Sequence, residues 1–144
     1  MSLYLDTSAL VKFYVEEEGS PLVRMAVEQA EVVGTSAIAY VEARAAFVRR
    51  RHEGRISAGV YRGIVRDLDR DWARYLLVEV TGAIIRQSAR LAESHRLRAY
   101  DAVHLASAAA VRGRLVEAVV FASWDLRLEK AASREGLQPL RPRR

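Results

Sequence analysis

Short apolar runs alternate with longer stretches of mixed apolar and polar residues along most of the chain. Four of these runs are predicted strands, and a fifth is a candidate for a short edge strand. The runs are residues 3–5, 32–33, 76–80, 118–122 and, for the edge candidate, 137–140. Short apolar strands separated by helices are typical of a parallel sheet covered on both faces. The pattern therefore predicts an α/β fold with a central, mainly parallel sheet of four or five short strands.

The longer stretches repeat apolar residues at helical spacing and are bounded by capping residues. Asp6, Thr7 and Ser8 can cap the helix that follows the first strand. Pro21, directly after Ser20, is typical of the first turn of the next helix. A glycine at position 113 is expected to stop the sixth helix. The predicted helices cover residues 9–17, 21–30, 37–52, 57–75, 82–95, 100–111 and 125–135.

The composition is that of a globular protein with an apolar core. The chain has 144 residues, of which 51% are hydrophobic, and we expect one domain over residues 1–144. The absence of cysteine excludes disulfides, thiolate zinc sites and thiol catalysis. The chain has no signal-peptide pattern and no apolar run near the ~20 residues that cross a bilayer. We therefore expect a cytoplasmic protein that does not contact membranes.

Positive charge is concentrated in one part of the chain. The net charge is +5, and the stretch from Arg44 to Arg74 contains nine arginines and four acidic residues. Within it, arginines recur every four residues from Arg62 to Arg74 and share one helix face. Such a face is either solvated or binds the phosphates of a nucleic acid through its guanidinium groups.

Four acidic residues stand out by their position in the predicted elements. Asp6 and Asp125 follow buried strands, whereas Glu42 and Asp101 lie near the start of helices with apolar surroundings. Ligands of parallel sheets collect at the carboxyl ends of the strands. Carboxylates that meet there need a compensating cation, and hard divalent ions prefer oxygen ligands. Taken singly, each acid could instead be a helix cap or half of an ion pair, and sequence spacing alone does not bring the four together.

Four segments resemble the motifs of PIN-domain nucleases, and in particular of the VapC-type toxins of bacterial and archaeal toxin–antitoxin pairs. The third segment is the most specific of them, and all four occur in the family's order along the whole chain. They are Leu5–Lys12, Thr35–Ser36 with Tyr40–Glu42, Arg98–Ala106 and Phe121–Leu128. Trp124 departs from the small or polar residue that is more usual in the fourth motif, which makes Asp125 the weakest of the expected ligands.

The resemblance implies a PIN-like three-layer α/β/α sandwich and a metal-dependent endoribonuclease, the toxin of a type II toxin–antitoxin pair. It implies that Mg²⁺ or Mn²⁺ is bound by the catalytic acids Asp6, Glu42, Asp101 and Asp125. Ser8 and Ser123 would orient these ligands or a water molecule. The implied partners are an RNA substrate, a cognate antitoxin and a second copy of the chain in a homodimer. The candidate contacts to RNA or antitoxin are Arg49, Arg50, Arg62 and Arg66.

Two other functions remain open at this stage. The domain could bind RNA or an antitoxin without catalysis, although the presence of all four acids disfavours that function. Phosphoryl transfer through an aspartyl-phosphate at Asp6 is a weaker candidate, because Ser8 occupies the position where such enzymes have a second aspartate. We interpret His104, three residues after Asp101, as a packed side chain rather than a general acid, and Trp72 and Trp124 as packing groups.

Overall fold

The computed structural model describes residues 1–141 of the chain. Within these residues, strands and helices follow one another in the predicted order, with one or two helices between successive strands. The strands are β1 (Ser2–Leu5), β2 (Val32–Ser36), β3 (Leu76–Val78), β4 (Val119–Ala122) and β5 (Gln138–Pro139). The helices are α1 (Thr7–Tyr14), α2 (Ser20–Gln29), α3 (Ala39–His52), α4 (Ala58–Trp72), α5 (Gly82–His95), α6 (Ala99–Arg114) and α7 (Leu126–Arg134).

The five described strands form one sheet in the order β3-β2-β1-β4-β5, and every neighbouring pair is parallel. The edge strand expected near residues 137–140 is present as β5. Because β1 lies between β2 and β4, the segment that follows Leu5 leaves the middle of the sheet. All carboxyl ends of the strands lie at the same edge, which is where such folds place their ligands.

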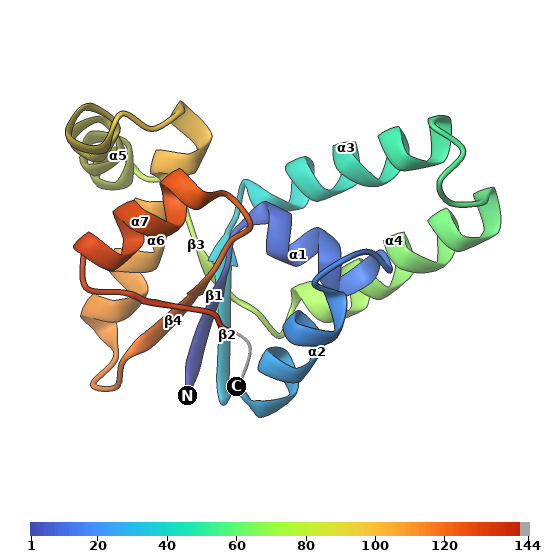
Figure 1. The fold of residues 1–144 in the computed structure, drawn as a ribbon, viewed down its shortest axis with the longest axis horizontal. Coiled ribbons are helices and arrows are strands. Elements are labelled where there is room, and N and C mark those ends of the chain that lie inside the picture. The colour runs from blue at the N-terminus through green and yellow to red at the C-terminus, as the bar shows by residue number, and fades with distance from the viewer. Residues whose placement is uncertain (142–144) are drawn as a thin grey trace.

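Helices cover both faces of the sheet, as Figure 1 shows, with α1 to α4 on one side and α5 to α7 on the other. Successive side chains of β1 point to opposite faces of the sheet and so contribute to both helical layers. Leu3 and Leu5 point into the first layer, whereas Tyr4 points into the second, and all three side chains are fully buried. The three-layer α/β/α sandwich expected from the sequence is therefore confirmed.

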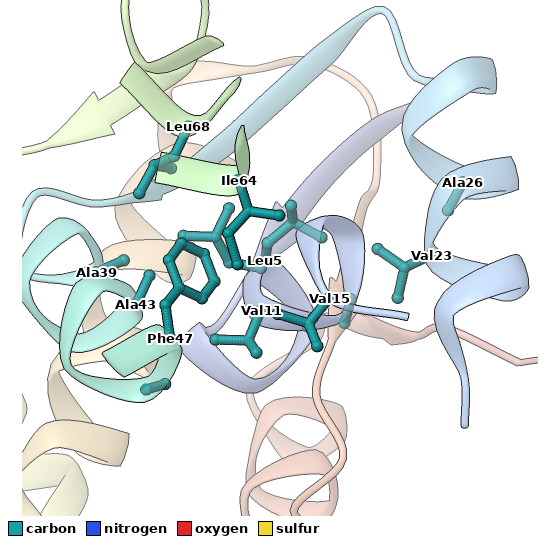
Figure 2. Packing of buried hydrophobic residues seen from close by; sticks show 14 of the residues in the cluster. Leu5, Val11, Val15, Val23, Ala26, Ala39, Ala43, Phe47, Ile64 and Leu68 are labelled. Atoms are coloured by element: carbon teal, nitrogen blue, oxygen red, sulfur yellow. The ribbon is translucent and has the colours of Figure 1, made fainter. Parts of the chain in front are cut away.

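The first core joins α1 and β1 to α3 and α4. Figure 2 shows Phe47 of α3 with Val11 of α1 and Ile64 of α4 beside it. Phe47 is fully buried. In the second core, the Tyr4 ring stacks on Phe121 of β4, with 5.6 Å between ring centroids. Burial of large apolar groups such as these is the main source of free energy for folding.

The helices α3 and α4 lie side by side and extend beyond the sheet as a long arm (Figure 1). At its base, Tyr40 meets the ring of Trp72 edge-on at 5.2 Å, in agreement with a packing role for that tryptophan. The arginines of the predicted stripe are exposed, and Arg62 and Arg66 among them lie on α4. Within residues 1–141, every helix is too short or too polar to cross a lipid bilayer.

Several predicted boundaries differ from the observed ones. The helix expected from residue 37 starts at Ala39, because the Ala37 amide donates to the Val78 carbonyl oxygen (2.9 Å) and prolongs the pairing of β2 with β3. The strand expected over residues 76–80 ends at Val78. Gly113 does not stop α6, which continues to Arg114. The first helix starts two residues earlier than predicted and ends at Tyr14.

We predict that Phe47→Ala lowers the free energy of unfolding by about 3–5 kcal/mol, because the change removes a fully buried ring that joins three helices. Urea unfolding followed by circular dichroism measures this value. Val41→Ala on the same helix is the control, since Val41 is 68% exposed and its loss is expected to cost at most about 0.5 kcal/mol. Equal effects of the two changes would contradict this account of the core.

Candidate functional site

The four acidic residues singled out in the sequence lie at the carboxyl edge of the sheet. Asp6 follows β1 and Asp125 follows β4, and each is the N-cap of the next helix. Glu42 lies in the first turn of α3, directly after β2. Asp101 lies in the first turn of α6, whose C-terminal end leads into β4 and whose N-terminal end therefore points to this edge. Helix N-termini favour negative charge, which suits all four positions.

Asp6 is the most buried of these acids, with 4% of its surface exposed. Its Oδ1 accepts hydrogen bonds from the Ala9 amide (2.9 Å) and the Ser8 hydroxyl (2.6 Å). Burial raises the pKa of the Asp6 carboxyl, although His104 and hydrogen bonds from Ser123, Ser8 and Ala9 oppose the increase. The charged form is therefore held at a cost, and added positive charge beside it would be stabilising.

Two serines connect Asp6 to the segment after β4. The Ser8 hydroxyl accepts a hydrogen bond from the Trp124 amide (3.1 Å) while it donates to Asp6. The Ser123 hydroxyl accepts from the Asp125 amide (3.0 Å) and also interacts with the Asp6 carboxyl. The first and fourth motifs are therefore held together through the serines that the sequence singled out.

Glu42 is held by two residues of different elements. Its Oε1 accepts a hydrogen bond from the Thr7 hydroxyl (2.6 Å) and lies 2.9 Å from Nε2 of His104. Burial raises the pKa of the Glu42 carboxyl, but these hydrogen bonds and the nearby imidazole outweigh it, so that the pKa falls below its usual value. His104 is 2% exposed, as expected of a packed side chain. A buried imidazole needs hydrogen-bond partners. The sequence did not identify Glu42 as one of them.

Asp101 and Asp125 share one arginine. Arg98 Nε lies 3.3 Å from Asp101 Oδ2, and Arg98 Nη2 lies 3.1 Å from Asp125 Oδ2. The other oxygen of Asp125, Oδ1, caps α7 by accepting from the Leu128 amide (3.0 Å). This role of Arg98, which opens the third motif, was not predicted from the sequence. Its guanidinium supplies the positive charge that the two neighbouring carboxylates require.

The acids thus fall into two pairs: Asp6 and Glu42 both interact with His104, and Asp101 and Asp125 share Arg98. Among residues 1–141, no three acidic or histidine side chains are grouped closely enough to hold a metal ion together. A hollow of about 540 Å³ beside the first pair is lined by Glu42, Thr7 and Ser8, among others. A second hollow of about 590 Å³ is lined by both residues of the second pair and by Arg98 and Trp124.

Basic side chains flank the first hollow. Arg49 is exposed on α3 and lines it, as does Lys12 of α1, whose Nζ lies 5.2 Å from the ring centroid of Trp124. Arg50 also lines this hollow, but its Nε lies 3.1 Å from Glu17 Oε2 and the pair is largely buried. Of the arginines predicted to contact RNA or an antitoxin, Arg49 is therefore the one that both lies beside the acids and has an exposed side chain.

Comparison with known proteins relates the whole of this arrangement to one family. The family model named PIN domain matches residues 3–132. Ribonuclease VapC49 of Mycobacterium tuberculosis strain H37Rv is 35% identical over 134 residues, which are 93% of this chain and 91% of the relative.

Solved structures have the same fold at lower identity. The crystal structure of FitAcB from Neisseria gonorrhoeae superposes with a TM-score of 0.64 at 19% identity, over 97% of each chain. A toxin–antitoxin complex from Klebsiella pneumoniae superposes with a TM-score of 0.57 at 17% identity, over 83% of this chain and 84% of the other. Since the family model and the mycobacterial relative both extend over most of the sequence, the chain belongs to the PIN domain family.

Proposed function

We propose that the protein is an endoribonuclease and the toxin of a type II toxin–antitoxin pair, with Asp6, Glu42, Asp101 and Asp125 as ligands of Mg²⁺ or Mn²⁺. The observation that supports this most strongly is that acids from four separate segments lie at one edge of the sheet, each at a helix N-terminus. The 35% sequence identity to a ribonuclease, over 93% of this chain, supports the choice of RNA as the substrate.

The residues at this edge fit a hard divalent cation in type and in electrostatics, whereas their spacing in residues 1–141 brings no three of them together around one ion. All four candidate ligands offer carboxylate oxygens, which Mg²⁺ and Mn²⁺ prefer. Asp6 is buried at a cost in its charged form, and the second pair already holds a positive group in Arg98. A bound divalent cation lowers the pKa of a water molecule and withdraws charge from the phosphate under attack.

The protein's own residues position these carboxylates and attract the substrate. Ser8 and the Ala9 amide fix one oxygen of Asp6, and Thr7 fixes one oxygen of Glu42. Helix N-termini point toward the acids and also suit the negative charge of a phosphodiester. Arg49 lies exposed on the wall of the hollow that Glu42 lines, where its guanidinium can pair with an RNA phosphate.

An antitoxin partner is part of the proposal. The similarity in fold to a chain of a toxin–antitoxin complex supports it, as do exposed apolar side chains near the acids. Tyr100 is 60% exposed and Val41 68% exposed, and both line the hollow beside Glu42. A partner segment that covers them would gain apolar burial and would block access of RNA. A homodimer, which light scattering can measure, remains a prediction.

We predict that the wild-type protein cleaves RNA in the presence of Mg²⁺ or Mn²⁺ and not in the presence of a chelator. Asp6→Asn and Asp101→Asn are each expected to lower the cleavage rate by at least about 100-fold, because loss of a ligand should exceed the 10–100-fold effect of losing a group that orients one. A fluorescent RNA assay gives the rates.

Asp67→Asn is the matched control, since Asp67 lies on α4 and forms a surface ion pair with Arg70. It is expected to leave the rate unchanged. Metal-dependent cleavage that survives both ligand substitutions would refute the proposed cluster. Binding of RNA without cleavage under either metal would instead favour a non-catalytic binding module.

The raised pKa of Asp6 predicts how pH affects stability in the presence of a chelator. A carboxyl with a raised pKa binds more protons in the folded than in the unfolded protein, between its usual pKa of about 3.9 and its folded value. Stability from this group is therefore present at low pH and is lost as the pH rises through that window. Asp6→Asn should accordingly become more stable relative to the wild type from about pH 4 upward.

Urea unfolding at several pH values measures this difference. Addition of Mn²⁺ at about 100 times its dissociation constant should then stabilise the wild type by about 2.7 kcal/mol, and Asp6→Asn by much less. A difference between the two proteins that is independent of pH would show that burial does not penalise the Asp6 charge.

A further inference from the structure

Four side chains form a continuous hydrogen-bonded chain from the interior to the candidate site. The Tyr4 hydroxyl lies 2.8 Å from Nδ1 of His104. On the other side of the ring, His104 Nε2 lies 2.9 Å from Glu42 Oε1 and 3.0 Å from the Thr7 hydroxyl oxygen. The Thr7 hydroxyl donates to the same Glu42 oxygen at 2.6 Å. The four residues come from β1, α1, α3 and α6, so the chain of contacts spans both layers of helices.

The inner end of this chain is rigid. Tyr4 is fully buried on the central strand and stacked on Phe121, with an angle of 3° between the rings. His104 is 2% exposed and meets the Tyr4 ring edge-on at 5.9 Å. Burial raises the pKa of Tyr4 well above its usual value, so the phenol keeps its proton. Packing therefore fixes both rings, and with them the position of the His104 nitrogen that contacts Glu42.

The direction of the hydrogen bonds follows from these contacts. If His104 is neutral, the Glu42 carboxylate, which can only accept, requires the ring proton on Nε2, and Nδ1 then accepts a hydrogen bond from the Tyr4 hydroxyl. If His104 is charged, both ring nitrogens donate. In either state Nε2 donates to Glu42, so the contact does not depend on a change of protonation. In the described part of the chain, Oε2 of Glu42 accepts no hydrogen bond.

We propose that Thr7 and His104, the latter held by Tyr4, are positioning residues that fix one oxygen of Glu42 and leave the other directed to a divalent cation. This inference rests on the proposed metal-dependent function. A glutamate side chain has three rotatable bonds and loses conformational entropy when it binds an ion. Two donors on Oε1 fix the carboxylate beforehand, in the way that groups behind a metal ligand usually do.

The test compares two pairs of variants by their affinity for Mn²⁺ alone, measured from the electron paramagnetic resonance signal of the free ion. Thr7→Val removes the hydroxyl and keeps the shape, whereas Thr7→Ser keeps the hydroxyl. His104→Leu removes both ring contacts, whereas His104→Gln keeps an amide that can donate to Glu42. His95→Gln is the control, because this histidine lies at the end of α5 and faces Glu135.

We expect Thr7→Val and His104→Leu to bind Mn²⁺ about 10–100-fold more weakly than the wild type, and Thr7→Ser, His104→Gln and His95→Gln to stay close to it. In RNA cleavage, the weakened variants should lose kcat with little change in KM once Mn²⁺ is limiting. Circular dichroism checks that each variant folds. If His104→Leu unfolds, the Thr7 pair still decides the question, since Thr7 is only half-buried.

Unchanged Mn²⁺ affinity in a folded Thr7→Val protein would overturn the positioning role and leave the proposed function intact. Equal losses in Thr7→Val and Thr7→Ser would also overturn it, because packing rather than the hydroxyl would then be responsible. A wild-type protein that binds no Mn²⁺ would refute the metal site of the proposed function, and the positioning role with it.

Discussion

Asp6 ends the central strand of the sheet with a carboxylate that is almost entirely removed from solvent. A charge in such a place requires donors on every side, and the local structure supplies them from several segments. The first turn of α1 provides the Ala9 amide, Ser8 links the acid to the amide of Trp124, and Ser123 approaches from the end of β4. The need to stabilise one buried charge thus fixes how the segments after β1 and β4 lie against each other.

The parallel sheet gives this charge its neighbours. Because β1 is central and every described pair of strands is parallel, the segments that follow β1, β2 and β4 meet at one edge, together with the first turn of α6. Each of the four acids has a protein partner there. Glu42 has Thr7 and His104, whereas Asp101 and Asp125 share an arginine. The site is therefore an organised set of paired carboxylates.

The fold could be predicted from short-range patterns, because apolar runs, caps and glycines are local signals. The layers, the parallel pairing of the strands and the edge strand were predicted from these signals. The predicted start of a helix was wrong where a tertiary contact sets it, as at Ala37, whose amide donates to the Val78 carbonyl oxygen. The acids could be named from motifs, and Asp6 and Asp125 could be placed at the carboxyl ends of strands, but the meeting of all four could not be derived from the sequence. Arg98 and His104 could not be assigned as partners, since the contacts of Arg98 with Asp125 and of His104 with Thr7 join residues 27 and 97 positions apart. No local pattern encodes such pairs.

The arginine between Asp101 and Asp125 has a consequence for how the protein is loaded. On the proposed function, a divalent ion at these acids would compete with a guanidinium tethered to the same chain, whose effective concentration does not fall on dilution. Without the ion, Arg98 already pairs with both carboxylates. Folding of this edge would then not depend on the ion.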